Sequence, residues 1–84
     1  MWRARMRERV VKERLVGLME KRGIDPGVVA EWLWEEFGKR VKPSWRDVRR
    51  VIVSDSDVTP QDLVLLLYEL GLDVDESLWE GVYD

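Results

Sequence analysis

The sequence predicts a small all-α domain of four to five helices. Apolar residues recur with helical spacing in several separate segments, and Gly or Pro beside a capping residue stands between those segments. With 84 residues, the chain is long enough to form one modest hydrophobic core. We expect a single helical domain over residues 10–79, a basic N-terminal arm or helix extension over 1–9, and an acidic tail over 80–84.

The first predicted helix runs from Trp2 to Arg22 and ends at Gly23, which suits the residue after a helix. One face carries apolar residues at i, i+4, i+7 and i+8, namely Val11, Leu15, Leu18 and Met19. A second stripe, Trp2, Met6 and Val10, drifts away from that face. The first two turns are therefore an arm or a contact surface.

The second predicted helix begins at Asp25 and Pro26, because Asp is a good N-cap and Pro is favoured at the first helical position. Gly38 ends it. The basic connector 39–43 is expected to be extended, because the residue before Pro43 is pushed out of helical geometry. The apolar residues that we expect to pack in the core are Val29, Ala30, Trp32, Leu33, Trp34 and Phe37.

The third predicted helix runs from Trp45 to about Val53, with Ser44 as N-cap and Asp47 at the position of a capping-box acid. Its apolar face consists of Trp45, Val48, Val51 and Ile52. Its opposite face consists of Arg46, Arg49 and Arg50. The β-branched run 51–53 also suits a strand, but the spacing of the apolar residues favours a helix.

The fourth predicted helix begins at Thr59 and Pro60, is apolar almost all round over Leu63–Leu70, and closes at Gly71. A helix without a polar face lies at the centre of a core or is covered by a partner. One more short turn or helix is expected after Asp75. The residues that we expect at a dimer interface are Leu65, Tyr68 and Trp79.

The charges divide the chain into two parts of opposite sign. Met1–Arg50 contains all 14 Lys and Arg residues and eight acids, so its net charge is +6. Val51–Asp84 contains nine acids and no Lys or Arg, so its net charge is −9. A chain of this kind offers a basic face to a polyanion although its total charge is −3.

The absence of Cys and His excludes several kinds of site. There is no disulfide framework, thiol nucleophile or thiolate metal site, and the usual proton shuttle at neutral pH is missing. Capping and turn formation account for the Asp pairs at 55/57 and 73/75. We therefore expect no enzyme activity, no cofactor, no bound metal and no small-molecule substrate.

The N-terminus is charged from Arg3 and shows no apolar run before a small-residue cleavage site, so we expect no secretory signal. The longest strongly apolar run, Leu63–Tyr68, is too short to span a bilayer. We therefore expect no membrane partner and a cytoplasmic location in a bacterium, an archaeon or a phage-infected cell. The absence of Asn and Cys and the heavy use of Arg and Glu favour a thermophilic source.

The basic residues around the third helix are the most informative feature. Residues 39–50 carry six positive charges and one negative charge, from Asp47. A helix docked by its apolar side suits the major groove of DNA when it projects arginines, because Arg pairs with guanine edges and with phosphates. The alternative is a solvated basic face balanced by the acidic half. The basic residues predicted to bind DNA here are Lys39, Arg40, Lys42, Arg46, Arg49 and Arg50.

Arginines also alternate through the first nine residues. As an arm, this segment would follow a phosphate backbone or enter a minor groove, and we count Arg3 and Arg5 among the predicted DNA contacts. As a helix, it would be a solubilising extension supported by an i, i+4 pair between Arg9 and Glu13.

Three segments carry a family resemblance. Leu15-Val16-Gly17-Leu18-Met19-Glu20-Lys21-Arg22-Gly23-Ile24 resembles the first helix of the lambda-repressor-like (Cro/C1, XRE-type) helix-turn-helix family. Val29-Ala30-Glu31-Trp32-Leu33 is similar to the Leu-Ala-Glu-x-Leu of its second helix, and Pro60 with residues 63–79 is similar to its C-terminal part. The chain departs from the family at Trp34, where the family has a Gly, and its connection before the third helix is longer.

The resemblance implies that Ser44–Val53 is the recognition helix of a dimeric transcriptional regulator. It adds Ser44 to the predicted DNA contacts, beside Arg46, Arg49 and Arg50 on the face toward DNA. The sequence thus predicts sequence-specific binding of double-stranded DNA with the basic helix 44–53 in the major groove, by a homodimer that reads two half-sites. The alternative is a protein-interaction module, phage or antitoxin-like, that binds a host protein through its acidic C-terminal half. A structural or assembly role is a third, weaker hypothesis.

Overall fold

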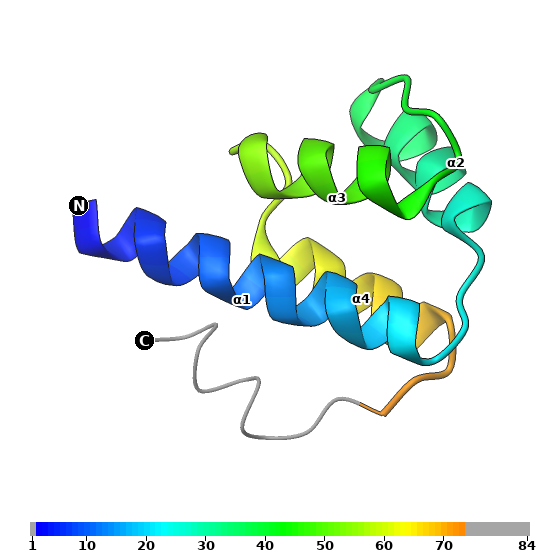
Figure 1. Cartoon of the computed structure of the whole chain (residues 1–84), viewed down its shortest axis with the longest axis horizontal. Helices are drawn as coiled ribbons and strands as arrows, with labels where there is room; N and C mark the ends of the chain where they lie inside the picture. Colours follow the sequence, from blue (N-terminus) through cyan, green and yellow to red (C-terminus); the bar gives the residue numbers. More distant parts are fainter. Residues whose placement is uncertain (1, 74–84) are drawn as a thin grey trace.

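The computed structural model describes the backbone of residues 2–73 and the side chains of residues 7–73. Four helices follow one another: α1 (Trp2–Lys21), α2 (Pro26–Phe37), α3 (Trp45–Ser54) and α4 (Pro60–Glu69) (Figure 1). Residues 2–73 contain no strand, and the run 51–53 is helical. The predicted all-α fold class is therefore confirmed. The additional helix expected after Asp75 lies outside the described residues.

The long helix α1 organises the fold. It packs against both α3 and α4, while α2 packs against α3 at the end of the molecule away from the N-terminus (Figure 1). The core is formed by apolar side chains from all four helices and from the loop before α4. Its fully buried members include Leu15, Met19, Leu33, Val48, Ile52, Val58, Leu63 and Leu67.

The predicted capping residues begin the helices as expected. The Asp25 carboxylate accepts a hydrogen bond of 2.9 Å from the Gly27 N–H at the start of α2. At the start of α4, Thr59 and Asp62 form a complete capping box, in which each side chain accepts from the other's backbone N–H. These bonds satisfy N–H groups that have no partner within the helix.

Gly38 ends α2 in the left-handed conformation, with φ of 65°. Its N–H donates to the Trp34 carbonyl, and the Lys39 N–H donates to the Leu33 carbonyl. A side chain at position 38 would be strained in this conformation, which explains why the helix stops at a glycine. The chain then leaves α2 as the connector 39–43, which is non-helical as predicted and turns into α3 through a hydrogen bond of 2.8 Å from the Ser44 N–H to the Lys42 carbonyl.

The N-terminal segment continues α1 without a break from Trp2. The helix-extension alternative for the basic arm therefore holds for the backbone, and the Arg9–Glu13 pair is present at 3.8 Å. Among the described side chains of α1, Val11 is the first that is buried, and the preceding Val10 is 45% exposed. Residues 7–10 of α1 thus lie outside the core.

Two side chains are placed differently from the sequence-based expectation. Trp34 was expected in the core but is 49% exposed, because it lies one position beyond the buried Leu33 on the outer side of α2. Lys12 is charged but only 3% exposed. The half-buried Trp32 and Trp45 pack against the core as expected.

Candidate nucleic-acid interface

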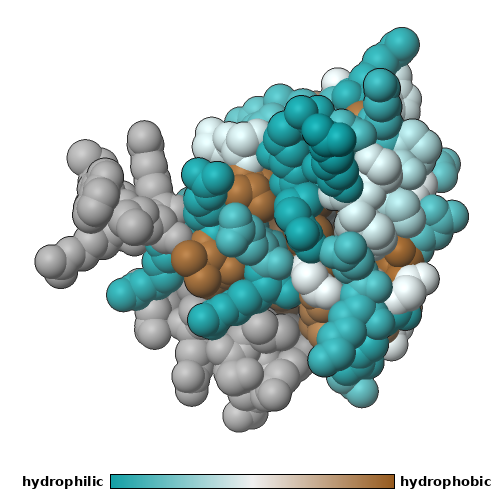
Figure 2. Space-filling view, viewed as in Figure 1, coloured by the Kyte–Doolittle hydropathy of each residue, from teal (hydrophilic) through white to brown (hydrophobic). Residues whose placement is uncertain are grey.

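Helix α3 has the two faces that the sequence predicts. Val48 and Ile52 are fully buried between α3 and its neighbours, whereas the three arginines on the other side, Arg46, Arg49 and Arg50, are exposed. Hydrophilic side chains gather over α3 and α1 on the face shown in Figure 2, with only small hydrophobic areas between them. The apolar face therefore fixes α3 in place and leaves its arginines accessible.

A shallow groove of about 460 Å³ runs between α1 and α3. It collects the arginines of α3 and adds one more from α1, and Glu13 is the one acid among its lining residues. The lining residues are Arg9, Glu13, Arg46, Arg49, Arg50, Val53 and Ser54. The structure thus places three of the predicted DNA contacts beside Arg9. Arg9 itself is not among the contacts predicted from the sequence.

Three of the four arginines form ion pairs at the groove. Arg49 pairs with Glu20 of α1, and Arg50 pairs with Asp47 at 2.8 Å. Arg9 pairs more loosely with Glu13. All of these arginines are well exposed, and exposed ion pairs contribute little, so an arriving polyanion can compete for the guanidinium groups.

Arg46 differs from the other arginines of the groove. It forms no ion pair among the described residues, although Asp47 is its neighbour in sequence. Its charge therefore lacks a direct carboxylate partner at the point where α3 begins. Because the first turn of a helix also carries unpaired N–H groups and the positive end of the helix dipole, an anion is favoured there.

Ser44 and Asp47 act together at the start of α3. The Ser44 hydroxyl accepts a hydrogen bond from the Asp47 N–H and donates one of 2.6 Å to the Asp47 carboxylate. This hydroxyl and the nearby Arg50 hold the pKa of Asp47 below its usual value. The hydroxyl of Ser44, a predicted DNA contact, is thus engaged in capping α3.

The basic residues of the connector lie in three different environments. The Lys39 ammonium pairs with the carboxylates of Asp55 at 2.8 Å and Asp57 at 3.4 Å. The Arg40 guanidinium lies 4.9 Å from the ring centre of Trp34, a cation–π contact on α2. Lys42 is exposed and has no ion pair within the described part of the chain.

Lys39 and Asp55 influence each other's ionisation. The hydrogen bond from Lys39 lowers the pKa of Asp55, with a further contribution from the Asp57 N–H, and the same pair raises the pKa of Lys39. Both groups therefore stay charged near neutral pH. Because two carboxylates balance Lys39, it offers less net positive charge to a polyanion than Lys42 does.

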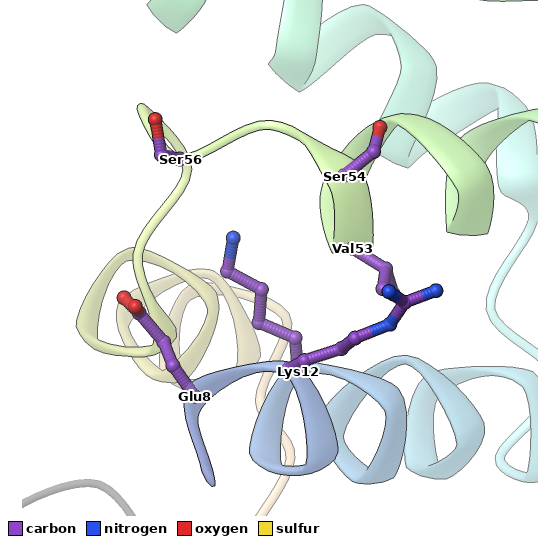
Figure 3. Close-up of a pocket in the computed structure, with 6 residues that line it drawn as sticks. Glu8, Lys12, Val53, Ser54 and Ser56 are labelled. Carbon is purple, nitrogen blue, oxygen red and sulfur yellow. The ribbon is translucent and has the colours of Figure 1, made fainter. Parts of the chain in front are cut away.

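Lys12 links α1 to the end of α3. Its ammonium donates hydrogen bonds to the carbonyls of Ile52 at 3.0 Å and Asp55 at 2.8 Å. Figure 3 shows Lys12 rising from α1 toward the loop after α3, with Glu8 one turn before it. The cation thus satisfies carbonyls at the negative end of the α3 dipole and holds the arginine-bearing helix on α1.

Sequence reasoning missed the role of Lys12. The available signal was its position three and four residues before Leu15 and Val16, which places it on the buried face of α1. The hollow around Lys12 adjoins the α1–α3 groove, because Arg9, Val53 and Ser54 line both. Burial lowers the pKa of Lys12, and the nearby carboxylates of Glu8, Asp55 and Asp62 oppose that effect.

The structure describes only some of the residues predicted at the dimer interface and in the N-terminal arm. Leu65 and Tyr68 are exposed on α4, by 61% and 51%, as expected for residues off the core stripe. The side chains of Arg3 and Arg5 lie outside the described side chains, as does the whole of Trp79. Their roles stay predictions.

Within residues 2–73, no helix is both long and apolar enough to cross a membrane. The described side chains contain no group of three or more acidic residues that could hold a metal ion. No protein-family model, curated protein or solved structure matches the chain.

Proposed function

We propose that this protein binds double-stranded DNA as a small transcriptional regulator, with α3 in the major groove. The observation that supports this function is the α1–α3 groove, whose lining contains four exposed arginines and one glutamate. Arginine is suited to both phosphates and guanine edges because its guanidinium donates two parallel hydrogen bonds. The resemblance of the sequence to the lambda-repressor-like family supports the same function.

The contacts divide by position. Arg46, at the exposed start of α3, is the residue that we assign to base or phosphate contact first, because it forms no ion pair with the side chains of residues 7–73. Arg9 and Arg49 flank the groove and are suited to the phosphate backbone, with Lys42 extending the positive surface into the connector. Ser44 and Lys39 act mainly by holding α3 and its following loop in place.

A homodimer would supply the second half-site. One helix of ten residues covers few base pairs, and useful specificity normally needs two copies on a pseudo-palindromic site. The exposed Leu65 and Tyr68 of α4 are the apolar surface that we assign to the second copy. They lie on a different helix from the arginines, so the dimer would leave α3 free for DNA.

The test is a titration of a labelled random-sequence duplex at two salt concentrations. Wild type is expected to bind, with affinity falling steeply as salt rises. The triple variant Arg46→Ala/Arg49→Ala/Arg50→Ala is expected to lose most of this binding. A charge-matched control, Arg14→Ala/Lys21→Ala/Arg22→Ala, removes the same charge from exposed positions outside the groove and is expected to retain most of it.

The absence of binding at low salt would contradict the proposal. An equal loss in the groove variant and in the control would also contradict it, because net charge and not the groove would then explain the affinity. Circular dichroism of each variant checks that the helices are retained.

A protein-interaction module is the second candidate function. It is favoured by a hollow between α2 and α4 with an apolar floor and a carboxylate rim that includes Glu36 and Glu69. The carboxylates make this hollow acidic, whereas the α1–α3 groove is basic. Retained self-association or peptide binding by a chain that fails to bind duplex would favour this candidate.

A further inference from the structure

The hollow between α2 and α4 has the size of one bulky side chain. Its volume is about 120 Å³, and its apolar floor includes Trp32, Phe37 and Leu65. Trp32 and Phe37 meet edge to face with ring centres 5.2 Å apart, which gives the floor a rigid aromatic wall. Such a hollow accepts a single apolar anchor from a partner.

The rim of this hollow is acidic. Glu36 of α2 and both Asp62 and Glu69 of α4 surround the apolar floor, and none of the described Lys and Arg side chains lines it. Asp62 and Glu69 lie three residues before and four residues after Leu65, on the same side of α4. The occupant must therefore bring positive charge together with its apolar anchor.

This charge argues against a symmetric contact between two α4 helices. Such a contact would bring Asp62 and Glu69 of one copy against the same residues of the other, and like charges placed together across an interface are unfavourable. The residues after Arg50 contain no Lys or Arg at all. A second copy can supply cations only from its first fifty residues.

The start of α1 has the complementary pattern. In sequence, Trp2 and Met6 are apolar residues one helical turn apart, and arginines stand at 3, 5, 7 and 9. The helix is continuous from Trp2, so about 13 Å of helix, at a rise of 1.5 Å per residue, precedes Val11, the first buried residue among the described side chains of α1.

A helix that begins in this way cannot reach the hollow of its own chain. The N-terminus lies at the opposite end of the molecule from α2 (Figure 1). Because α1 is an unbroken helix, its first turns cannot fold back across the domain. The first turns of α1 can instead reach the hollow of a second copy.

We propose that the first turns of α1, residues 2–9, dock into the α2–α4 hollow of a second copy, and that the exchange is reciprocal. Two copies lying antiparallel fill both hollows at once, which gives a closed twofold dimer instead of an open chain. The inference rests on the homodimer of the proposed function. It names residues 2–9 of the second copy as the segment that covers Leu65. Arg9 belongs both to this segment and to the α1–α3 groove, so the docking contact is tested without DNA.

The test exchanges charges between the two partners. One variant, Glu36→Lys/Glu69→Lys, makes the rim basic; the other, Arg3→Glu/Arg5→Glu, makes the docking segment acidic. Asp62 is left unchanged because it caps α4. Molar mass is measured by size-exclusion chromatography with light scattering, in low salt and without DNA.

Wild type is expected to be a dimer, and each variant alone is expected to dissociate at least tenfold more readily. An equimolar mixture of the two variants is expected to form a heterodimer, because both of its docking contacts again pair opposite charges. The control Arg14→Glu/Arg22→Glu has the same charge change as the second variant and is expected to stay dimeric.

A monomeric wild type would overturn the inference, and so would a mixture of the variants that does not associate. If Leu65→Glu is monomeric while Arg3→Glu/Arg5→Glu stays dimeric, α4 is still the dimer surface but the docked segment is not residues 2–9. The duplex titration with Arg46→Ala/Arg49→Ala/Arg50→Ala is separate, because those three residues lie in the α1–α3 groove and outside the segment 2–9. Failure of DNA binding and failure of the docking contact are therefore distinguishable.

Discussion

The Lys12 ammonium donates a hydrogen bond of 3.0 Å to the carbonyl of Ile52, a residue forty positions further along the chain. Ile52 belongs to the last turns of α3, where carbonyls have no donor within the helix. The bond therefore connects α1 to the C-terminal end of the helix that carries the exposed arginines. The position of the α3 arginines relative to Arg9 of α1 depends on this connection.

Replacing Lys12 by Met is expected to destabilise the protein. Met fills a similar volume but cannot donate to the Ile52 carbonyl, and a buried acceptor left without a partner costs about 1–3 kcal/mol. Urea unfolding followed by circular dichroism measures the change in the free energy of unfolding. The control Arg14→Met, at an exposed position of α1, is expected to stay within about 0.5 kcal/mol of wild type.

A Lys12→Met variant as stable as wild type would contradict this role. It would show that the cost of burying the ammonium, which also lowers the pKa of Lys12, cancels the benefit of its hydrogen bonds.

The carboxylate of Asp55 is expected to make stability fall in acid. Its pKa is lower in the folded protein than the ordinary 3.8, mainly because Lys39 donates to it. The pair therefore stabilises the fold above about pH 4, and the benefit is lost as the pH falls through the lower folded pKa. Asp47, whose pKa is also lowered, adds to the same effect.

The measurement is the melting temperature between pH 2 and pH 7 for wild type and for Asp55→Asn. The variant is expected to melt at a lower temperature near pH 7 and to show a shallower decrease below about pH 4. Parallel pH curves for the two proteins would exclude Asp55 as a source of the acid sensitivity.

The helices could be predicted from the sequence because their signals are local. Asp25, Ser44 and Thr59 each stand directly before the helix that they cap, and the end of α2 is marked by Gly38. The two faces of α3 follow from the spacing of Val48 and Ile52. A capping residue and a turn of helix are separated by only a few positions, so short stretches of sequence contain the whole interaction.

The candidate site was less predictable because its partners come from different helices. The pair of Arg49 with Glu20 and the bond of Lys12 to Ile52 connect positions 29 and 40 residues apart. No helical spacing relates residues so far apart. The sequence therefore predicted that the arginines of α3 would be exposed. It did not predict which of them pair with a carboxylate, nor that Arg9 of α1 lies in the same groove.

Adjacent residues of α2 are expected to differ greatly in their effect on stability. Leu33 is fully buried, so Leu33→Ala leaves a cavity in the core and is expected to cost about 2–5 kcal/mol. Trp34 is half exposed, so Trp34→Ala removes mainly surface contacts, including that with Arg40, and is expected to cost less than about 1 kcal/mol. Thermal unfolding of both variants measures the difference, and a larger cost for Trp34→Ala would show that its ring supports the core.

Glu20 is expected to restrain the DNA affinity of the proposed interface. Its carboxylate pairs with Arg49, so Glu20→Gln removes a negative charge beside the groove and releases a guanidinium for a phosphate. The affinity for a labelled duplex is expected to rise about two- to fivefold at low salt, corresponding to about 0.4–1 kcal/mol, the range of an exposed ion pair. The matched variant Glu31→Gln removes the same charge from an exposed position of α2 outside the groove and is expected to change the affinity less. Because the gain is electrostatic, it should shrink as salt is added, and equal gains from both variants would assign the effect to net charge and not to Arg49.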